Sequence, residues 1–261
     1  MASRPAPSRS IRSDTVAERT RLDQALEARG LTPSRARARD AILRGTVEVN
    51  GVVATKPNQQ VSETDVITLY DPAAGYVSRA ALKLIAGLDA GGIDPMGKTC
   101  LDLGSSTGGF TQVLLERGAR HVYAVDVGHG QLHESLARDS RVTSLEGVNG
   151  RDVTADLIPE PIDLVVSDVS FVSILKVIFP ALALTRAGAE AVILIKPQFE
   201  VGREYIGKGG IVTDDAAIAA AAERIVVAMA EAGWALRFAV ASPIAGGDGN
   251  RETVAGFRRD A

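Results

Sequence analysis

The stretch "CLDLGSSTGGFTQVLL", residues 100–115, decides the fold. Its first four residues are typical of a buried strand, its end follows a helical period, and three glycines lie between them. Glycines at 104, 108 and 109 let the backbone turn tightly and let a ligand approach it closely. Their order matches neither the GxGxxG dinucleotide fingerprint nor the GxxxxGK[ST] phosphate loop. A strand that ends in Asp-x-Gly before such a turn favours an adenosyl amino acid as the ligand.

The alternation of strand and helix continues along the chain. The strand-like runs are 99–103, 121–126, 141–145, 162–168 and 191–196, and the helix-like runs are 78–87, 109–118, 130–139 and 214–233. Short apolar strands that alternate with helices predict an α/β fold, with a parallel sheet covered by helices on both faces. Two later strand-like runs, 235–242 and 252–257, would complete the sheet.

Composition limits the possible functions. The chain has 261 residues, 46% of them hydrophobic, but no apolar run approaches the roughly 18 residues that a membrane span needs. Its one cysteine, Cys100, excludes an internal disulfide and a cysteine-built metal site, so we expect no metal and a cytoplasmic location. The net charge of −3 argues against a globally basic nucleic-acid binder. Residues 1–70, however, carry 11 Lys and Arg against 8 Asp and Glu, which favours this part as the partner of a polyanion.

The N-terminal part has a pattern of its own. We predict a mobile polar tail over 1–19, a small α+β domain over 20–70, a linker over 71–77 and the sheet domain over 78–261. The small domain combines a helix that ends near Gly30, a second helix with Ser34 as its N-cap, and two short strands. The first strand ends in Asn50-Gly51, a strong signal for a hairpin turn.

Basic residues gather on the second predicted helix and just beyond the hairpin turn. They are Arg35, Arg37, Arg39, Arg44 and Lys56. Taken alone, the cluster is more typical of a solvated helix face than of a phosphate-binding surface.

Acidic residues follow three successive strands of the predicted sheet. Asp126 lies 24 residues after Asp102, where a carboxylate can accept hydrogen bonds from both ribose hydroxyls of a nucleotide. Asp152 is a candidate for binding the adenine amino group. A sheet of this type that binds another ligand remains an alternative. The predicted cofactor-binding residues are Asp102, Gly104, Ser105, Ser106, Thr107, Gly108, Gly109, Asp126 and Asp152.

A second group of charged residues is predicted at the same edge of the sheet. Asp168 and Lys196 end neighbouring strand-like runs, Lys83 lies on the helix before the sheet, and Glu252 begins the last strand. Two lysines and two carboxylates beside a cationic sulfonium suit methyl transfer to a hydroxyl, which needs help with its proton. Other acceptors fit less well. Methylation at cytosine C5 needs a nucleophilic cysteine, but Cys100 lies at the end of its strand opposite the charged group. Methylation at an exocyclic nitrogen typically uses prolines after the fourth strand, and "SDVSFVS", residues 167–173, has none.

These motifs together resemble the TlyA (hemolysin A-like) family of ribosomal RNA 2′-O-methyltransferases over about residues 20–255. The N-terminal stretch 21–51 and "KP" at 56–57 resemble the family's RNA-binding module, of a type shared with a ribosomal protein. The remaining motifs, "SRAALKL", "LDLGSSTGGFTQVLL", "VYAVDVGHGQL", "DVSFVS", "IKPQFE" and "KGGIVTD", resemble its FtsJ-like domain.

The resemblance implies a Rossmann-like class I methyltransferase that uses S-adenosylmethionine and acts on ribosomal RNA or ribosomal subunits, on a cytidine. It also implies a catalytic tetrad, which falls on Lys83, Asp168, Lys196 and Glu252. It favours phosphate contacts for the arginine cluster, because structured RNA is recognised largely through its backbone. The N-terminal extension resembles the subgroup that acts on RNA of both subunits.

The chain departs from the family pattern at two places. It has Ala80 and Ala81 where the family often has glycine, and Thr253 where a bulkier residue often follows the last glutamate. Two alternatives stay open: a methyltransferase for another RNA acceptor, and an RNA-binding ribosome-assembly factor without turnover. Despite the hemolysin name, an aromatic content of 4% and the lack of an apolar span argue against pore formation.

Overall fold

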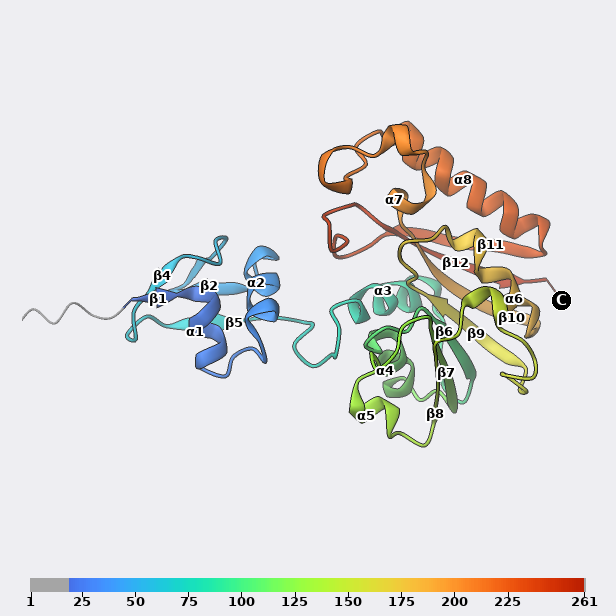
Figure 1. Ribbon diagram of the computed structural model, residues 1–261, viewed down its shortest axis with the longest axis horizontal. Helices are drawn as coiled ribbons and strands as arrows, with labels where there is room; N and C mark the ends of the chain where they lie inside the picture. Colours follow the sequence, from blue (N-terminus) through green and yellow to red (C-terminus); the bar gives the residue numbers. More distant parts are fainter. Residues whose placement is uncertain (1–18, 261) are drawn as a thin grey trace, which may run out of the picture. The chain divides into compact units, whose positions relative to one another are not determined.

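The computed structural model describes residues 19–260, which form two compact units divided between Ala74 and Gly75 (Figure 1). The boundary lies inside the segment 71–77 that we predicted as a linker. The mobile tail predicted over 1–19 lies, except for Arg19, outside the described residues. Within 19–260, no helix is both long and apolar enough to cross a bilayer.

The N-terminal unit contains the two predicted helices, a three-stranded sheet (β3-β2-β5) and a two-stranded sheet (β1-β4) (Figure 1). Its elements are β1 (Thr20–Arg21), α1 (Leu22–Ala28), α2 (Arg35–Leu43), β2 (Val47–Val49), β3 (Val52–Val53), β4 (Gln60–Val61) and β5 (Ile67–Leu69). Ser34 caps α2 as predicted, because its Oγ accepts a hydrogen bond from the backbone N–H of Arg37 at 3.3 Å. The β2–β3 turn has positive φ at Asn50 (53°) and Gly51 (79°), as the Asn-Gly signal predicts.

A core of its own holds this unit together. The apolar faces of α1 and α2 pack on β2, with Leu22, Leu26, Ala38, Ala41, Ile42 and Val47 fully buried. The buried positions on α1 and α2 follow the helical period that predicts these two helices.

The C-terminal unit is built on a seven-stranded sheet with the order β11-β12-β10-β9-β6-β7-β8. Its strands are β6 (Thr99–Leu103), β7 (His121–Asp126), β8 (Val142–Glu146), β9 (Ile162–Ser167), β10 (Thr185–Ile195), β11 (Trp234–Ala241) and β12 (Thr253–Arg259). Strands β6 to β10 are parallel, as predicted, but β12 is antiparallel to both β10 and β11. No helix separates β11 from β12, and consecutive strands joined by a loop alone pair antiparallel.

Helices cover both faces of this sheet (Figure 1). They are α3 (Ala81–Gly91), α4 (Gly109–Glu116), α5 (Glu134–Ala137), α6 (Ile178–Ala183), α7 (Pro197–Glu200) and α8 (Asp215–Glu231). The buried side chains of α3, α4 and α5 belong to one apolar cluster, and those of α6 and α8 belong to the other. The sheet is packed between these two helix layers, which fixes the positions of the strand ends from which the site is built.

The elements α6, α7, β1 and β4 are not among the predicted runs, and two predicted elements have other bounds. The helix predicted over 130–139 is only one turn, because the Glu146 carboxylate accepts the backbone N–H groups of Gly130, Gln131 and Leu132 and holds them as a loop. The strand predicted from Ala191 begins earlier, at Thr185, and its pairing with β9 is irregular before residue 190.

Candidate active site

The glycine-rich turn after β6 leaves no room for side chains at two positions. Gly104 has φ +85°, and a Cβ there would lie 2.9 Å from Cγ1 of Val169. Gly108 has φ +98°, and a Cβ there would lie 2.3 Å from Cδ1 of Leu136. Both positions therefore need glycine for conformation and for space, because neighbouring parts of the protein fill the space that a Cβ would take.

A cavity of about 530 Å³ opens beside this turn, at the carboxyl ends of the parallel strands. Its wall includes Gly104 and Ser106 of the turn, Asp126 at the end of β7, and the segments 148–151 and 168–172. Ser105, Thr107 and Gly109 line a smaller adjoining cavity of about 140 Å³, which shares Gly104, Ser106, Asp168 and Ser170 with the first. The volume is in the range typical of small-molecule and cofactor sites.

Asp126 links the turn to the neighbouring strand. Its Oδ2 accepts the backbone N–H of Ser106 at 2.8 Å, and its Oδ1 accepts that of Gly128 at 2.7 Å. The side chain is partly exposed on the cavity wall, so its remaining lone pairs are available to a ligand.

The other two predicted acidic residues are not on the wall. Asp102 is fully buried beneath the turn, where its Oδ2 accepts the Thr111 hydroxyl at 2.7 Å and its Oδ1 has no hydrogen-bond partner within the described residues. Burial raises the pKa of Asp102 to about 7. Asp152 is exposed at the end of a 3₁₀ turn, Gly150–Asp152, and the wall is formed instead by Asn149, Gly150 and Arg151. Asp102 therefore binds Thr111 at the start of α4 and does not line the cavity.

A further cavity of about 400 Å³ adjoins the first, and all four residues of the predicted tetrad line it. Asp168, Ser170 and Phe171 line both cavities and so mark their junction.

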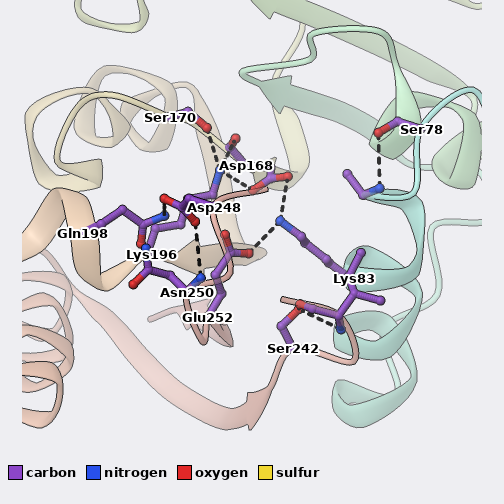
Figure 2. A network of polar contacts seen from close by, with 12 residues as sticks. Ser78, Lys83, Asp168, Ser170, Lys196, Gln198, Ser242, Asp248, Asn250 and Glu252 are labelled. Carbon is purple, nitrogen blue, oxygen red and sulfur yellow. Dashed lines mark hydrogen bonds and ion pairs between the residues drawn. The ribbon is translucent and has the colours of Figure 1, made fainter. Parts of the chain in front are cut away.

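The tetrad forms one connected network of ion pairs (Figure 2). Asp168 lies at its centre: its Oδ1 is 2.8 Å from Nζ of Lys196, and its Oδ2 is 3.5 Å from Nζ of Lys83. Lys83 also contacts Oε2 of Glu252 at 2.6 Å. Lys83, Lys196 and Glu252 are about 95% buried, whereas the Asp168 side chain is 14% exposed toward the cavities. Burial of four charged groups is tolerated only because they pair with one another.

Strand direction explains how the tetrad assembles. Asp168 follows β9 and Lys196 follows β10, so the parallel strands deliver both to the same edge. Because β12 is antiparallel, its beginning lies at that edge, with Thr253 paired to Ile195, and Glu252 directly precedes it. Lys83 reaches the network from the first turn of α3.

Lys196 has three close partners. Its Nζ donates to the backbone O of Asp168 at 3.1 Å and to Oγ of Ser170 at 2.8 Å, and it forms an ion pair with Oδ1 of Asp168 at 2.8 Å. Two of the three N–H donors of the ammonium group therefore have a hydrogen-bond acceptor, because Oδ1 of Asp168 accepts no hydrogen bond from the described residues. Ser170 is neutral and exposed at the cavity junction, so its contact with Lys196 is the one that a ligand can replace most easily.

Sequence reasoning missed several residues at the junction. Phe171 is 92% exposed, has φ +67°, and its ring lies 5.5 Å from that of Phe199. Gln198 of α7 donates to Oδ2 of Asp248, in the turn before Glu252, at 3.2 Å. The signal that could have found them is proximity to Asp168 and Lys196 in the sequence.

The basic cluster of the N-terminal unit divides into engaged and exposed residues. Arg44 contacts Oδ2 of Asp40 at 2.8 Å and makes a bidentate pair with Asp71 at 2.7 and 2.8 Å, contacts that raise its pKa. Arg37 donates to the backbone O of Ala73 at 2.7 Å. The other three predicted residues are exposed, although Arg35 also reaches a carboxylate, Asp23, at 3.5 Å; they are Arg35, Arg39 and Lys56.

Comparison with known proteins agrees with this architecture. The FtsJ-like methyltransferase family model matches residues 76–259, and the S4 domain model matches residues 20–67. The 16S/23S rRNA (cytidine-2′-O)-methyltransferase TlyA of Mycobacterium tuberculosis (strain CDC 1551 / Oshkosh) is 44% identical over 91% of this chain and 89% of its own. Hemolysin A of Brachyspira hyodysenteriae is 42% identical over 91% of this chain and 99% of its own.

Solved structures show the same relationship. The protein named "Putative hemolysin" from Streptococcus thermophilus superposes with a TM-score of 0.73 at 33% identity, covering 94% of this chain and 90% of that chain. The chain belongs to the TlyA (hemolysin A-like) family of rRNA methyltransferases, with an FtsJ-like methyltransferase domain that follows an S4 domain.

Proposed function

We propose that this protein transfers a methyl group from S-adenosylmethionine to the ribose 2′-hydroxyl of a cytidine in ribosomal RNA, in the cytoplasm. The observation that carries the proposal is the buried Lys83–Asp168–Lys196–Glu252 network, which opens at Asp168 onto the junction of two adjoining cavities. The S4 domain and the activity named for the Mycobacterium tuberculosis relative support ribosomal RNA as the substrate.

The side chains near the junction favour a hydroxyl over a base carbon as the acceptor. Methylation at cytosine C5 needs a thiolate, but Cys100 is fully buried in β6 and burial raises its pKa to about 12. The lysine–carboxylate network, in contrast, offers groups that can polarise an O–H bond and stabilise the charge that develops on its oxygen.

The first cavity suits the cofactor. Bound S-adenosylmethionine supplies a methyl group on a cationic sulfonium. Asp126 would accept hydrogen bonds from the ribose hydroxyls, and the glycine-rich turn would present backbone N–H groups to the amino-acid end. Gly104 of the turn lines this cavity, whereas Gly108 lines none of the three cavities described.

The cavity of about 400 Å³ that the tetrad lines suits the acceptor nucleoside. The 2′-hydroxyl would replace Ser170 as a hydrogen-bond partner of Lys196, which would polarise it. Asp168 would hold Lys196 in position. Lys83 and Glu252 would in turn fix the Asp168 carboxylate. Methyl transfer would form the new O–C bond as the S–C bond breaks, and the hydroxyl proton would leave to water or to the neutral amine form of Lys196.

The test is incubation of the protein with each ribosomal subunit and labelled S-adenosylmethionine, followed by nucleoside mapping. The expected product is 2′-O-methylcytidine in one or both subunits. A label on a base, or no label with either subunit, would contradict the proposal. The separate subunit reactions also show how broad the specificity is.

Asp126→Ala is expected to weaken S-adenosylmethionine binding tenfold or more. Each charge-assisted hydrogen bond to the ribose contributes roughly 1.5–3 kcal/mol, and the variant also releases the Ser106 N–H of the turn. Isothermal titration calorimetry measures the affinity. Glu134→Ala, which removes an exposed carboxylate of the same unit, is the control. Unchanged affinity in a folded Asp126→Ala protein would remove Asp126 from the cofactor site.

The double variant Arg35→Ala/Arg39→Ala is expected to weaken RNA binding and to flatten its dependence on salt, because fewer phosphate contacts release fewer counterions. Arg37 and Arg44 are left in place because they bind Ala73 and Asp71. Affinity for ribosomal RNA is measured at several salt concentrations, with Arg138→Ala as a control in the other unit. A salt slope equal to that of the unmodified protein would assign the cluster to a solvated helix face.

A further inference from the structure

The short helix α7, directly after Lys196, contacts both segments that carry the tetrad carboxylates. Gln198 reaches Asp248, in the turn before Glu252. Phe199 packs against Phe171, in the loop after Asp168. Glu200 is the third outward contact of this helix, and it also points to the loop after Asp168.

Glu200 makes two short hydrogen bonds to that loop. Its Oε2 accepts the Ser173 hydroxyl at 2.8 Å, and its Oε1 accepts the Ile174 backbone N–H at 2.8 Å. The side chain is half-buried, and burial raises the pKa of its carboxyl group. The cations that face it are Arg224 of α8, which donates to its backbone O at 2.7 Å, and Lys176.

The loop that Glu200 holds has an unfavourable backbone conformation. Phe171 has φ +67°, which is uncommon for a bulky residue without special support. Such a conformation persists only where surrounding contacts fix it. The ring contact with Phe199 fixes one point of the loop, and the two hydrogen bonds to Glu200 fix its far end.

We propose that Glu200 is a positioning residue for methyl transfer, which fixes the 168–174 loop through Ser173 and Ile174 so that Asp168 and Ser170 meet Lys196. The inference rests on the proposed function. Glu200 lines neither cavity, so its carboxylate acts on the reacting groups through the loop that it binds. A displacement of about 1 Å among such groups is enough to slow a reaction by a large factor.

The experiment compares single-turnover methylation of ribosomal subunits by Glu200→Ala, Glu200→Gln and Ser173→Ala. Glu200→Ala is expected to lower the rate at least about tenfold, with affinities for S-adenosylmethionine and RNA within about twofold of the unmodified protein. Glu200→Gln is expected to retain most of the rate, because its amide oxygen still accepts the Ile174 N–H and its amide nitrogen can donate to the Ser173 oxygen. Glu223→Ala, an exposed glutamate on α8, is the matched control.

Each outcome separates the positioning role from the proposed function. If the unmodified protein methylates no RNA, the proposed function fails. If the unmodified protein is active and folded Glu200→Ala keeps its rate, the positioning role is wrong. If Glu200→Ala does not fold, Ser173→Ala decides: a loss of about fivefold, from one hydrogen bond worth roughly 1 kcal/mol, supports the role, and an unchanged rate overturns it.

Discussion

Lys196→Ala is expected to lower the single-turnover rate of methyl transfer by at least about 10²-fold, while RNA binding is largely retained. A ribose hydroxyl is a poor nucleophile until its proton is removed or strongly polarised. Lys196 contacts two of the three residues that mark the cavity junction, Asp168 and Ser170. Its loss removes the group that assists the proton, whether it acts as a base or as a charged stabiliser of the developing alkoxide.

Lys196→Arg is not expected to rescue the rate. Guanidinium is planar and keeps its proton, whereas the two hydrogen-bond acceptors and the Asp168 carboxylate around Nζ suit a compact ammonium group. The measurement is rapid quenching with labelled cofactor at saturating enzyme, with RNA affinity determined separately. If the rate of the alanine variant is within a few-fold of the unmodified rate, Lys196 has no role in methyl transfer and only forms an ion pair at the strand end.

The parts of the site that the sequence predicts are those fixed by strand ends. Buried apolar runs locate β9 and β10, and in a parallel sheet the residues that follow them, Asp168 and Lys196, must lie at the same edge. The same logic places Asp126 on the cavity wall. Glu252 lies at this edge for a different reason. It precedes β12, which runs antiparallel to β11 because only a loop joins the two strands.

The parts that the sequence does not predict depend on local backbone paths and distant partners. Asp152 follows β8, but a 3₁₀ turn capped by Asn149 leaves its side chain exposed off the wall. Arg44 looks like its arginine neighbours in the sequence, yet it pairs with Asp71, 27 residues away, in the segment predicted as a linker. The positive φ of Phe171 has no sequence signal of the kind that glycine provides.

Substitutions at Lys83 and Glu252 are expected to change the stability of the fold and the rate of methyl transfer independently. Its atoms lie 2.6 Å apart and both side chains are more than 90% buried. Lys83→Met leaves the buried Glu252 carboxylate without its lysine, which is expected to destabilise the fold by about 3–5 kcal/mol. Adding Glu252→Leu removes that unpaired charge, and a well-packed apolar pair in place of a buried ion pair is often neutral or stabilising.

The double variant Lys83→Met/Glu252→Leu is therefore expected to regain most of the stability lost in Lys83→Met but none of the activity. Asp168 then keeps Lys196 but loses the contact that fixes its Oδ2, so its carboxylate is free to turn away from the cavity junction. Urea denaturation gives the free energy of unfolding for both variants, and single-turnover methylation gives the rate. Glu223→Leu, on the exposed face of α8, is the control for a Glu→Leu change outside the network. A double variant as unstable as Lys83→Met would show that the pair stabilises the fold by its own attraction, and a double variant with near-normal activity would remove both residues from the catalytic machinery.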